Sequence, residues 1–287
     1  MKIYIFFNGD FYPEKTPLLS ILDRGLCFGD GLFELIRCIK GRFLLFSKHI
    51  KRMRDSATFL EIPFPYGENE LLNAAKELTR RNKIKDGELY IEITRGEAPR
   101  YHQFPKKTEP NFFLVLNPLR EMPEECWARG VKVITFPDIR WGYCHLKTIN
   151  LLPNVLAKEM AKNSNAYEAF FTREDKKGTY LTEGSSSSIF AIKNGFLMTS
   201  ELDNILPGTT RAAVIEIAMK RKISVKETRL YLKEFIESDE AFLTSTVSEV
   251  MPVIKINDRL IASGMIGDLT LKLQSEYKKF IKEHLEW

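Results

Sequence analysis

The sequence has few of the residues that build metal sites or disulfide frameworks. Its 287 residues include four cysteines and four histidines. The cysteines Cys27, Cys38, Cys126 and Cys144 form no C-x-x-C pair, and no histidine cluster lies near them. Zinc sites need such close ligand spacings. We therefore expect no metal site, and we expect reduced thiols, as in cytoplasmic proteins.

Long runs of a single residue class are also missing. No apolar stretch approaches the roughly 20 residues that cross a bilayer, and no secretory leader precedes the first expected strand at 3–7. The net charge of +5 is spread along the chain without a run of five basic residues. We therefore expect a cytoplasmic protein with neither a membrane nor a nucleic acid as its partner.

The composition that remains is that of an ordinary soluble globular protein, with 44% hydrophobic and 28% charged residues. Alternating apolar patterns predict strands at 88–94 and 111–116, and helical spacing predicts helices at 48–60 and 68–82. This mixture indicates an α+β fold. Turn-forming residues at 118–123 predict a linker between an N-terminal domain, residues 1–117, and a C-terminal domain, residues 124–287.

The segment H-L-K-T-I-N-L-L-P-N-V-L-A at 145–157 places Lys147 between an expected strand at 131–136 and an expected helix that begins near Pro153. A desolvated lysine amine loses its proton more easily, and it can then form a Schiff base with an aldehyde. The alternative is a solvated surface lysine, which is the ordinary case in a chain with 43 Lys and Arg residues.

A second segment, T-E-G-S-S-S-S at 182–188, runs directly into the apolar residues 189–192. By composition it resembles a flexible linker. A linker would not lead straight into a buried strand, however. Glu183 would then be a partly buried carboxylate that needs a cationic partner, and the small residues Ser185 and Ser186 would let a ligand approach the backbone closely.

Three further segments carry groups suited to anions. L-P-G-T-T-R at 206–211 begins an expected helix, whose free N–H groups bind anions unless Thr209 or Thr210 simply caps it. The segment T-S-T-V-S-E at 244–249 is rich in hydroxyl groups, although it also fits an ordinary polar turn. The basic residues at 49–54 include Arg52, whose forked guanidinium suits a phosphate.

The loop at 94–105 brings Arg100 and His102 within one residue of each other, so both side chains can face one anion if the loop is not simply exposed. Together the segments supply an amine, a carboxylate, a candidate phosphate cradle and a candidate carboxylate clamp. Those are the groups needed to hold pyridoxal phosphate and an amino acid.

From about residue 20 onward, five ordered blocks resemble the fold-type IV pyridoxal-phosphate aminotransferases. The blocks are D-R-G-x-x-F-G-D-G, L-K-T-I-N-L-L-P-N-V-L-A, T-E-G-S-S-S-S-I-F, L-P-G-T-T-R and F-L-T-S-T-V-S-E-V-M-P-V. Within that family, T-R-G-x-x-P-R-x-H-Q-F-P at 94–105 and I-R-W at 139–141 are most similar to the D-amino-acid aminotransferases.

The resemblance implies a smaller N-terminal α/β sandwich-like domain and a larger C-terminal pseudo-barrel domain. It implies pyridoxal 5'-phosphate as cofactor, and ping-pong transamination between a D-amino acid, such as D-alanine, and a 2-oxo acid, such as 2-oxoglutarate. It also implies a homodimer with the active site at the subunit interface.

Residue roles follow from the same resemblance. Lys147 would bind the cofactor aldehyde as a Schiff base and later move a proton, and Glu183 would pair with the pyridine nitrogen. Arg100 and His102 would bind the substrate α-carboxylate from the neighbouring subunit. The residues expected to bind the phosphate or line the cofactor are Arg52, Ser185, Ser186, Leu206, Thr209, Thr210, Ser245 and Thr246.

One position departs from the D-amino-acid enzymes, which usually carry a tyrosine where this chain has Phe33. The segment F-E-L-I-R at 33–37 is similar to the F-E-G-I-R of branched-chain aminotransferases, and Arg37 would then supply the missing polar contact. Leu35, Tyr90 and Arg140 would shape the side-chain pocket. Three alternatives stay open: a branched-chain L-amino-acid aminotransferase, an aminodeoxychorismate lyase of the same fold, and a nucleic-acid or anion-binding module.

Overall fold

The computed structural model describes residues 3–16, 18–119 and 122–286. The chain divides into two compact units: residues 1–121 with 146–150 and 284–287 form the first, and 122–145 with 151–283 form the second. Two residues of the predicted linker, 120 and 121, lie outside the described residues. That the units are separate domains with the predicted bounds stays a prediction.

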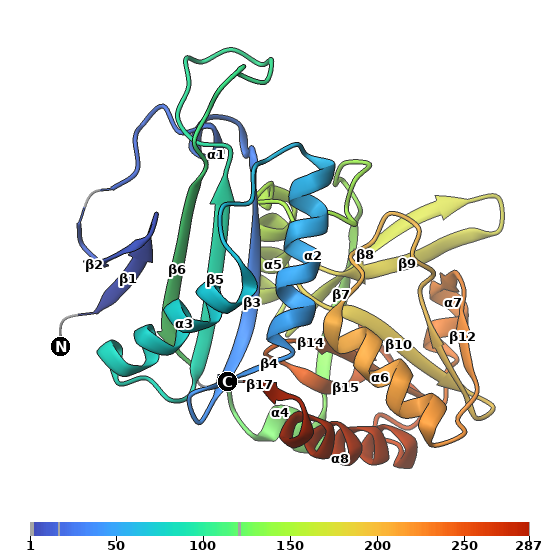
Figure 1. The fold of residues 1–287 in the computed structure, drawn as a ribbon. Helices are drawn as coiled ribbons and strands as arrows, with labels where there is room; N and C mark the ends of the chain where they lie inside the picture. The colour runs from blue at the N-terminus through green and yellow to red at the C-terminus, as the bar shows by residue number, and fades with distance from the viewer. Residues whose placement is uncertain (1–2, 17, 120–121, 287) are drawn as a thin grey trace. The chain divides into compact units, whose positions relative to one another are not determined.

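The first unit is built on a seven-stranded antiparallel sheet with the order β17-β4-β3-β5-β6-β1-β2. Its helices α2 and α3 lie across one face of this sheet (Figure 1). The elements are β1 (Tyr4–Phe7), β2 (Asp10–Pro13), α1 (Arg24–Phe28), β3 (Gly31–Ile39), β4 (Arg42–Leu44), α2 (Phe46–Phe59), α3 (Glu68–Asn82), β5 (Gly87–Thr94), β6 (Asn111–Pro118) and β17 (Leu285–Glu286).

The two faces of this sheet differ because side chains alternate along each strand. The face under α2 and α3 is a closed apolar core, in which Ile36, Ile91 and Leu114 are fully buried. The opposite face carries half-buried aromatic side chains, among them Phe33 and Tyr90. The second face is therefore the one that is open to chemistry.

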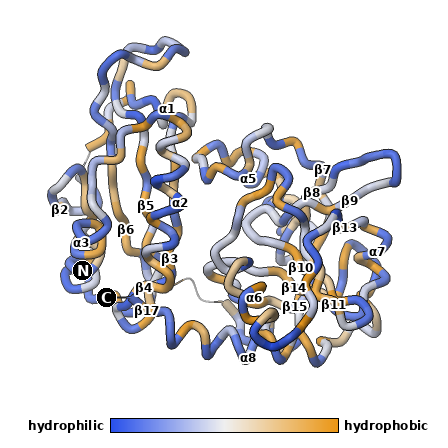
Figure 2. The backbone as a smooth tube through the Cα atoms, turned by 45° about the vertical axis from the view of Figure 1, so that its right-hand side comes forward, coloured by the Kyte–Doolittle hydropathy of each residue, from blue (hydrophilic) through white to orange (hydrophobic). Residues whose placement is uncertain are grey.

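The second unit holds a ten-stranded mixed sheet with the order β12-β11-β10-β14-β15-β7-β8-β9-β13, and β16 pairs with β15. β7 lies parallel to both of its neighbours. The hairpin between β8 and β9 is hydrophilic at its tip (Figure 2). The strands are β7 (Val131–Pro137), β8 (Glu168–Asp175), β9 (Gly178–Gly184), β10 (Ser188–Lys193), β11 (Phe196–Thr199), β12 (Val225–Glu227), β13 (Leu230–Tyr231), β14 (Glu240–Ser245), β15 (Glu249–Ile256) and β16 (Arg259–Leu260).

Helices cover the second sheet, and both units together confirm the predicted α+β class. α8 buries Leu273 and Tyr277 against α6 and the sheet. Among the described residues, no helix is both long and apolar enough to cross a bilayer. The helices are α4 (Glu125–Arg129), α5 (Leu152–Asn163), α6 (Thr209–Lys220), α7 (Leu232–Ile236) and α8 (Asp268–Glu283).

Candidate active site

Lys147 is held in place by main-chain hydrogen bonds between its segment and β3 of the first unit. Its carbonyl accepts a hydrogen bond from the Phe33 N–H at 2.9 Å, and the Ile149 N–H donates to the Gly31 carbonyl at 3.2 Å. Thr148 forms a β-bridge with Leu32. The predicted domain bounds place Lys147 in the second domain. In the structure, by contrast, main-chain hydrogen bonds attach its segment to the beginning of β3 in the first unit.

The side chain of Lys147 lies on an aromatic surface. Its Nζ is 4.2 Å from the centre of the Phe33 ring, a cation–π contact. The Phe33 ring stacks on Tyr90 with 5.7 Å between ring centres, and the Tyr90 hydroxyl donates to Glu92 Oε2 at 2.5 Å. Leu35 lies opposite Tyr90 in the strand register. Phe33, Tyr90 and Lys147 are thus brought together, along with Glu92, which the sequence analysis missed.

Arg52, on α2, forms a two-point ion pair with the buried Glu34 of β3. Its Nε donates to Glu34 Oε1 at 2.7 Å and its Nη2 to Oε2 at 2.8 Å. His49 Nδ1 donates to the same carboxylate at 2.7 Å. Burial alone would raise the pKa of Glu34, but Arg52 and His49 hold it well below its usual range. The pair fixes the direction of the Arg52 guanidinium, as a phosphate-binding residue requires.

His49 also shows that this cluster is near Lys147. Burial lowers the pKa of His49, and although Glu34 opposes this shift, the positive charges of Arg52 and Lys147 add to the lowering. The predicted phosphate-binding Arg52 and the predicted catalytic Lys147 accordingly belong to one neighbourhood of the first unit.

Arg100 and His102 lie on an exposed loop, and both pack against the ring of Phe28. The Arg100 guanidinium carbon is 5.1 Å from the centre of that ring, and the His102 ring centre is 5.4 Å from it. Arg24 holds the backbone of the loop. It donates to the carbonyls of Tyr101 at 2.6 Å and His102 at 3.2 Å. Phe28 and Arg24 thus bring the two predicted carboxylate-binding residues together.

Arg24 is fixed in turn by Asp30, whose Oδ2 accepts from the Nε of Arg24 and from the Nε of Arg95, both at 2.8 Å. Arg95 lies 3.6 Å from the ring centre of Phe104 at the far end of the same loop. Arg24 and Asp30 belong to the D-R-G-x-x-F-G-D-G block, and the sequence alone predicts no role for them. Their role in holding the loop appears only in the structure.

Arg37 is engaged away from the Phe33 ring. Its Nη1 donates to the carbonyls of Cys38 at 2.6 Å and Gly87 at 2.9 Å, at the far end of β3 and β5. Four residues of strand separate Arg37 from Phe33, which is about 13 Å. Its proposed compensation for the missing tyrosine hydroxyl stays a prediction that this geometry does not favour.

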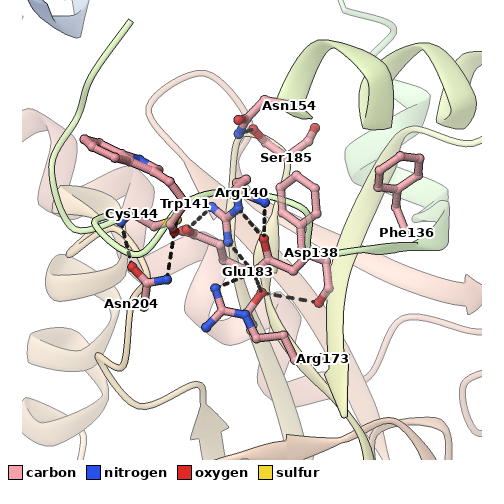
Figure 3. A network of polar contacts seen from close by, with 12 residues as sticks. Phe136, Asp138, Arg140, Trp141, Cys144, Asn154, Arg173, Glu183, Ser185 and Asn204 are labelled. Atoms are coloured by element: carbon pink, nitrogen blue, oxygen red, sulfur yellow. Dashed lines mark hydrogen bonds and ion pairs between the residues drawn. The ribbon is translucent and has the colours of Figure 1, made fainter. Parts of the chain in front are cut away.

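In the second unit, the predicted cationic partner of Glu183 is Arg140. The Nη1 of Arg140 donates to Glu183 Oε1 at 2.5 Å, and its Nε and Nη2 donate to Asp138 at 2.9 and 3.0 Å (Figure 3). Arg173 also reaches Asp138, at 2.8 Å. Burial raises the pKa of Glu183, and Arg140 opposes that shift. Since Arg140 is committed to these carboxylates, its predicted part in the side-chain pocket stays a prediction.

The serine segment is ordered by Glu168 of β8. The Ser185 hydroxyl donates to Glu168 Oε1, and the Ser186 hydroxyl donates to Oε2 at 2.8 Å. The Ser185 carbonyl accepts from Asn154 Nδ2 at 2.8 Å (Figure 3). These contacts exclude the flexible-linker alternative, because three hydrogen bonds to Glu168 and Asn154 fix the segment directly after Glu183.

The candidate anion site lies at the first turn of α6. Leu206 N–H donates to both oxygens of Glu183 at 3.2 Å, so the Glu183 carboxylate and the start of α6 are neighbours. Gly208 is the N-cap, and a Cβ there would lie 2.9 Å from Ser188 Oγ. Thr209 and Thr210 follow, and Thr210 lies beside the buried Tyr277 hydroxyl. Backbone N–H groups and hydroxyls at a helix start suit a phosphate.

Ser245 and Thr246 lie at the turn between β14 and β15. The Ser245 hydroxyl donates to Ser248 Oγ at 2.9 Å and accepts from the Ser248 N–H at 2.9 Å. The buried Thr244 Oγ1, one residue earlier, has no hydrogen-bond partner among the residues that the structure describes. The donor set of the second unit is thus a carboxylate, a helix start and several hydroxyls. These groups fit the ring nitrogen and the phosphate of pyridoxal phosphate, and in the first unit the Lys147 amine fits its aldehyde and the Arg52 guanidinium its phosphate.

Comparisons with known proteins agree with this chemistry. The model of the family described as amino-transferase class IV matches residues 31–256. A D-alanine aminotransferase of Staphylococcus epidermidis is 37% identical over 281 residues, which are 98% of each chain. A T.th. branched-chain amino acid aminotransferase, solved with pyridoxamine 5'-phosphate, is 27% identical, with a TM-score of 0.89 over 100% of this chain and 99% of that one. The Escherichia coli branched-chain enzyme shares the fold at 23% identity, with a TM-score of 0.91 over 100% and 99% of the two chains.

Proposed function

We propose, on the premise that this chain belongs to the class IV aminotransferases, that it transfers the amino group of a D-amino acid such as D-alanine to a 2-oxo acid such as 2-oxoglutarate. Its cofactor is pyridoxal phosphate, as in the rest of the family. The observation that carries the proposal is Lys147, whose amine is held over the Phe33 ring. Nearly full-length relatives named D-alanine aminotransferase support the choice of substrate.

Each part of the site would have a distinct task. When bound, pyridoxal phosphate supplies an aldehyde carbon for the amino group and a ring that accepts the electrons of the substrate Cα–H bond. The Lys147 amine would hold the aldehyde carbon, and the Glu183 carboxylate would hold the proton on the ring nitrogen. Arg52 and the first turn of α6 would bind the phosphate.

Lys147 would also move the proton of the reaction. Its Nζ, once free, would take the α-proton from the substrate Cα and would hold it for return later in the half-reaction. Arg100 and His102 would bind the substrate α-carboxylate and so orient the Cα–H bond. Because both half-reactions use one pocket, we expect ping-pong kinetics.

The test is to incubate the purified enzyme with 2-oxoglutarate and either D-alanine or L-leucine, and then to determine the chirality of the glutamate formed. Consumption of D-alanine with formation of D-glutamate supports the proposal. We expect Lys147→Ala to abolish both turnover and the visible absorbance band, and a Lys147→Ala variant that kept both would contradict its role.

The second candidate function is transamination of branched-chain L-amino acids. Phe33 favours it, because the D-amino-acid enzymes usually carry a hydroxyl there and the F-E-L-I-R segment is similar to that of the branched-chain enzymes. The T.th. branched-chain aminotransferase also shares the fold over nearly its whole length. Consumption of L-leucine with formation of L-glutamate in the same assay would establish this alternative.

We further propose that the enzyme acts as a cytoplasmic homodimer in which Arg100 and His102 of one protomer reach the active site of the other. The exposure of both side chains supports this arrangement. So does the exposed apolar face of α5, made by Leu152, Val155, Leu156 and Met160.

Mixed dimers test the exchange of residues between protomers. A Lys147→Ala protomer and an Arg100→Ala, His102→Ala protomer are each inactive alone, but a mixed dimer contains one complete site if the loop acts in trans. Recovery of activity on mixing and refolding supports the proposal, and no recovery in a confirmed mixed dimer contradicts it. Cell fractionation tests the location.

A further inference from the structure

Glu92 lies on the same sheet face as the aromatic surface beneath Lys147. In the register of β3 and β5 it is directly opposite Phe33, and such cross-strand neighbours have Cβ atoms about 5 Å apart. The amine of Lys147 is 4.2 Å above that Phe33 ring. An amino acid that takes the place of this amine therefore lies within one side-chain length of the Glu92 carboxylate.

The Glu92 carboxylate has a hydrogen bond but no counter-ion. Tyr90 donates its hydroxyl to Glu92 Oε2 at 2.5 Å. Among the described residues no cationic side chain forms an ion pair with Glu92, and Arg37, on the same face, is about 13 Å farther along the sheet. The charge of Glu92 is therefore not neutralised by its own sheet.

The surroundings screen the ionised Glu92 carboxylate less than water does, so its interaction with a charge on a bound substrate is stronger. Glu92 is half-buried, and burial raises its pKa; Tyr90 opposes that shift, while the nearby Asp23 carboxylate adds to it. Asp23 is itself fully buried, and it accepts from Thr94 Oγ1 and Asn111 Nδ2, both at 2.7 Å. Two carboxylates thus make this side of the face electronegative, and partial burial strengthens any charge–charge interaction there.

We infer that Glu92 is a specificity-determining residue, which favours a neutral or cationic substrate side chain and disfavours a second carboxylate. The inference rests on the proposed function, because it assumes that the substrate is bound at Lys147. A like charge brought next to a partly desolvated carboxylate lowers affinity. 2-Oxoglutarate then remains an acceptor, but a poorer one than a 2-oxo acid without the second carboxylate.

The first test is the half-reaction of the cofactor-loaded enzyme with an amino acid, followed by absorbance without an acceptor. D-Alanine, D-glutamate and D-lysine differ mainly in side-chain charge and length. We expect kcat/KM for D-glutamate, relative to D-alanine, to rise roughly tenfold in Glu92→Gln, and that for D-lysine to fall. Glutamine keeps an oxygen for the Tyr90 hydroxyl, so the variant changes the charge and little else.

Glu88→Gln is the matched control. Glu88 lies on the same strand and the same face, opposite Arg37, and is about 13 Å from Glu92. We expect this variant to leave the ratio of the two amino acids unchanged. An unchanged ratio in Glu92→Gln, or an equal rise in both variants, would overturn the inference.

A binding measurement separates this inference from the proposed function. Calorimetric titration of the wild-type enzyme with butyrate and glutarate, neither of which can react, measures the cost of the second carboxylate directly. We expect glutarate to bind more weakly than butyrate, and we expect Glu92→Gln to remove the difference. Equal affinities of the wild-type enzyme for butyrate and glutarate would contradict the inference. If glutarate binds more weakly while no amino acid reacts, Glu92 still repels a second carboxylate, and it is the proposed function that fails.

Discussion

Phe33 and Lys147 contact each other through both main chain and side chain. The Phe33 N–H donates to the Lys147 carbonyl at 2.9 Å, while the Lys147 amine lies 4.2 Å over the Phe33 ring. The first contact fixes the backbone of the lysine, and the second fixes the height of its amine above β3. Phe33, which replaces the tyrosine usual in the D-amino-acid enzymes, thus helps to position the candidate catalytic lysine.

Phe33→Tyr tests what the missing hydroxyl costs. The ring and its cation–π contact would remain, and the new hydroxyl would offer one more hydrogen bond to the substrate carboxylate. We expect kcat/KM for D-alanine to rise about fivefold, as one added hydrogen bond of about 1 kcal/mol would produce. Phe33→Leu is the control, and we expect it to lose activity because the ring beneath the amine is gone. No gain in Phe33→Tyr would show that the site does not use a hydroxyl there.

The Glu34–Arg52 pair predicts an acid-dependent loss of stability. The pKa of Glu34 is lowered in the folded state, so its contribution to the free energy of unfolding is complete above the unfolded value, 4.5. It is lost as the pH falls from that value through the folded pKa. We expect Glu34→Gln to lower the free energy of unfolding by about 3 kcal/mol at pH 7, and by less at pH 3.5. Urea unfolding at fixed protein concentration measures both values.

Glu77→Gln is the control for that experiment. Hydrogen bonds from Arg80 and Arg81 lower the pKa of Glu77 to about 2, but this pair is on the exposed surface of α3, where solvent screens it. We expect little change in stability at either pH. A loss in Glu34→Gln that stayed the same from pH 7 to pH 3.5 would contradict the linkage to the Glu34 carboxyl.

The four cysteines are expected to react in two classes. Burial raises the pKa of the Cys38 and Cys144 thiols to about 11, whereas Cys27 and Cys126 are half-exposed. Because the thiolate is the nucleophile, we expect a thiol reagent at pH 8 to modify Cys27 and Cys126 first, and the other two only after unfolding. Mass spectrometry of the modified peptides assigns the sites. Rapid modification of Cys144 in the folded enzyme would be inconsistent with its burial.

Local sequence patterns predict those helices and strands whose formation depends mainly on residues close together in the chain. The helix predicted at 68–82 has the bounds of α3, because Leu71, Ala75 and Leu78 repeat at helical spacing and Glu68 begins the first turn. β12 was missed because its three residues form a strand only by pairing with the distant β11. No short-range pattern carries that information.

The glycines of the D-R-G-x-x-F-G-D-G block show the same limit. Three glycines in seven residues favour tight turns, but of Gly25, Gly29 and Gly31 only Gly29 has a positive φ, 69°. Gly25 lies inside α1, where a Cβ would approach Thr94 Cγ2 to 2.4 Å. Glycine is needed at this position because α1 packs closely against a strand distant in the sequence, and the sequence alone does not reveal that contact.

In the candidate site too, some features were predictable from the sequence and others were not. The chemical type of Lys147, Glu183 and Arg52 was evident from the sequence, but their partners were not. Arg140 was expected near the substrate side chain, and its contacts with Glu183 and Asp138 were not predicted. A buried carboxylate needs a cationic partner, but only the folded structure determines which cation lies within reach of it.

Arg24 gives the last prediction, since it connects the buried core of the first unit to the exposed loop of Arg100 and His102. Its guanidinium donates to backbone carbonyls of that loop and to Asp30, and it lies 4.8 Å from the centre of the Phe28 ring, so it acts as a positioning residue. We expect Arg24→Lys to raise KM for D-alanine about tenfold, because a single ammonium group cannot hold both carbonyls and the carboxylate-binding residues shift. Since Lys147 is untouched, kcat should change little.

The split between KM and kcat distinguishes positioning from a general loss of structure. Arg81→Lys is the control, because Arg81 lies on α3, where it pairs with Glu77 and packs on the rings of Tyr4 and Phe11. We expect this variant to leave both constants unchanged. A melting temperature close to that of the wild type would show that Arg24→Lys remains folded. If kcat fell with KM unchanged, Arg24 would be acting on the chemical step and not on the placement of the loop.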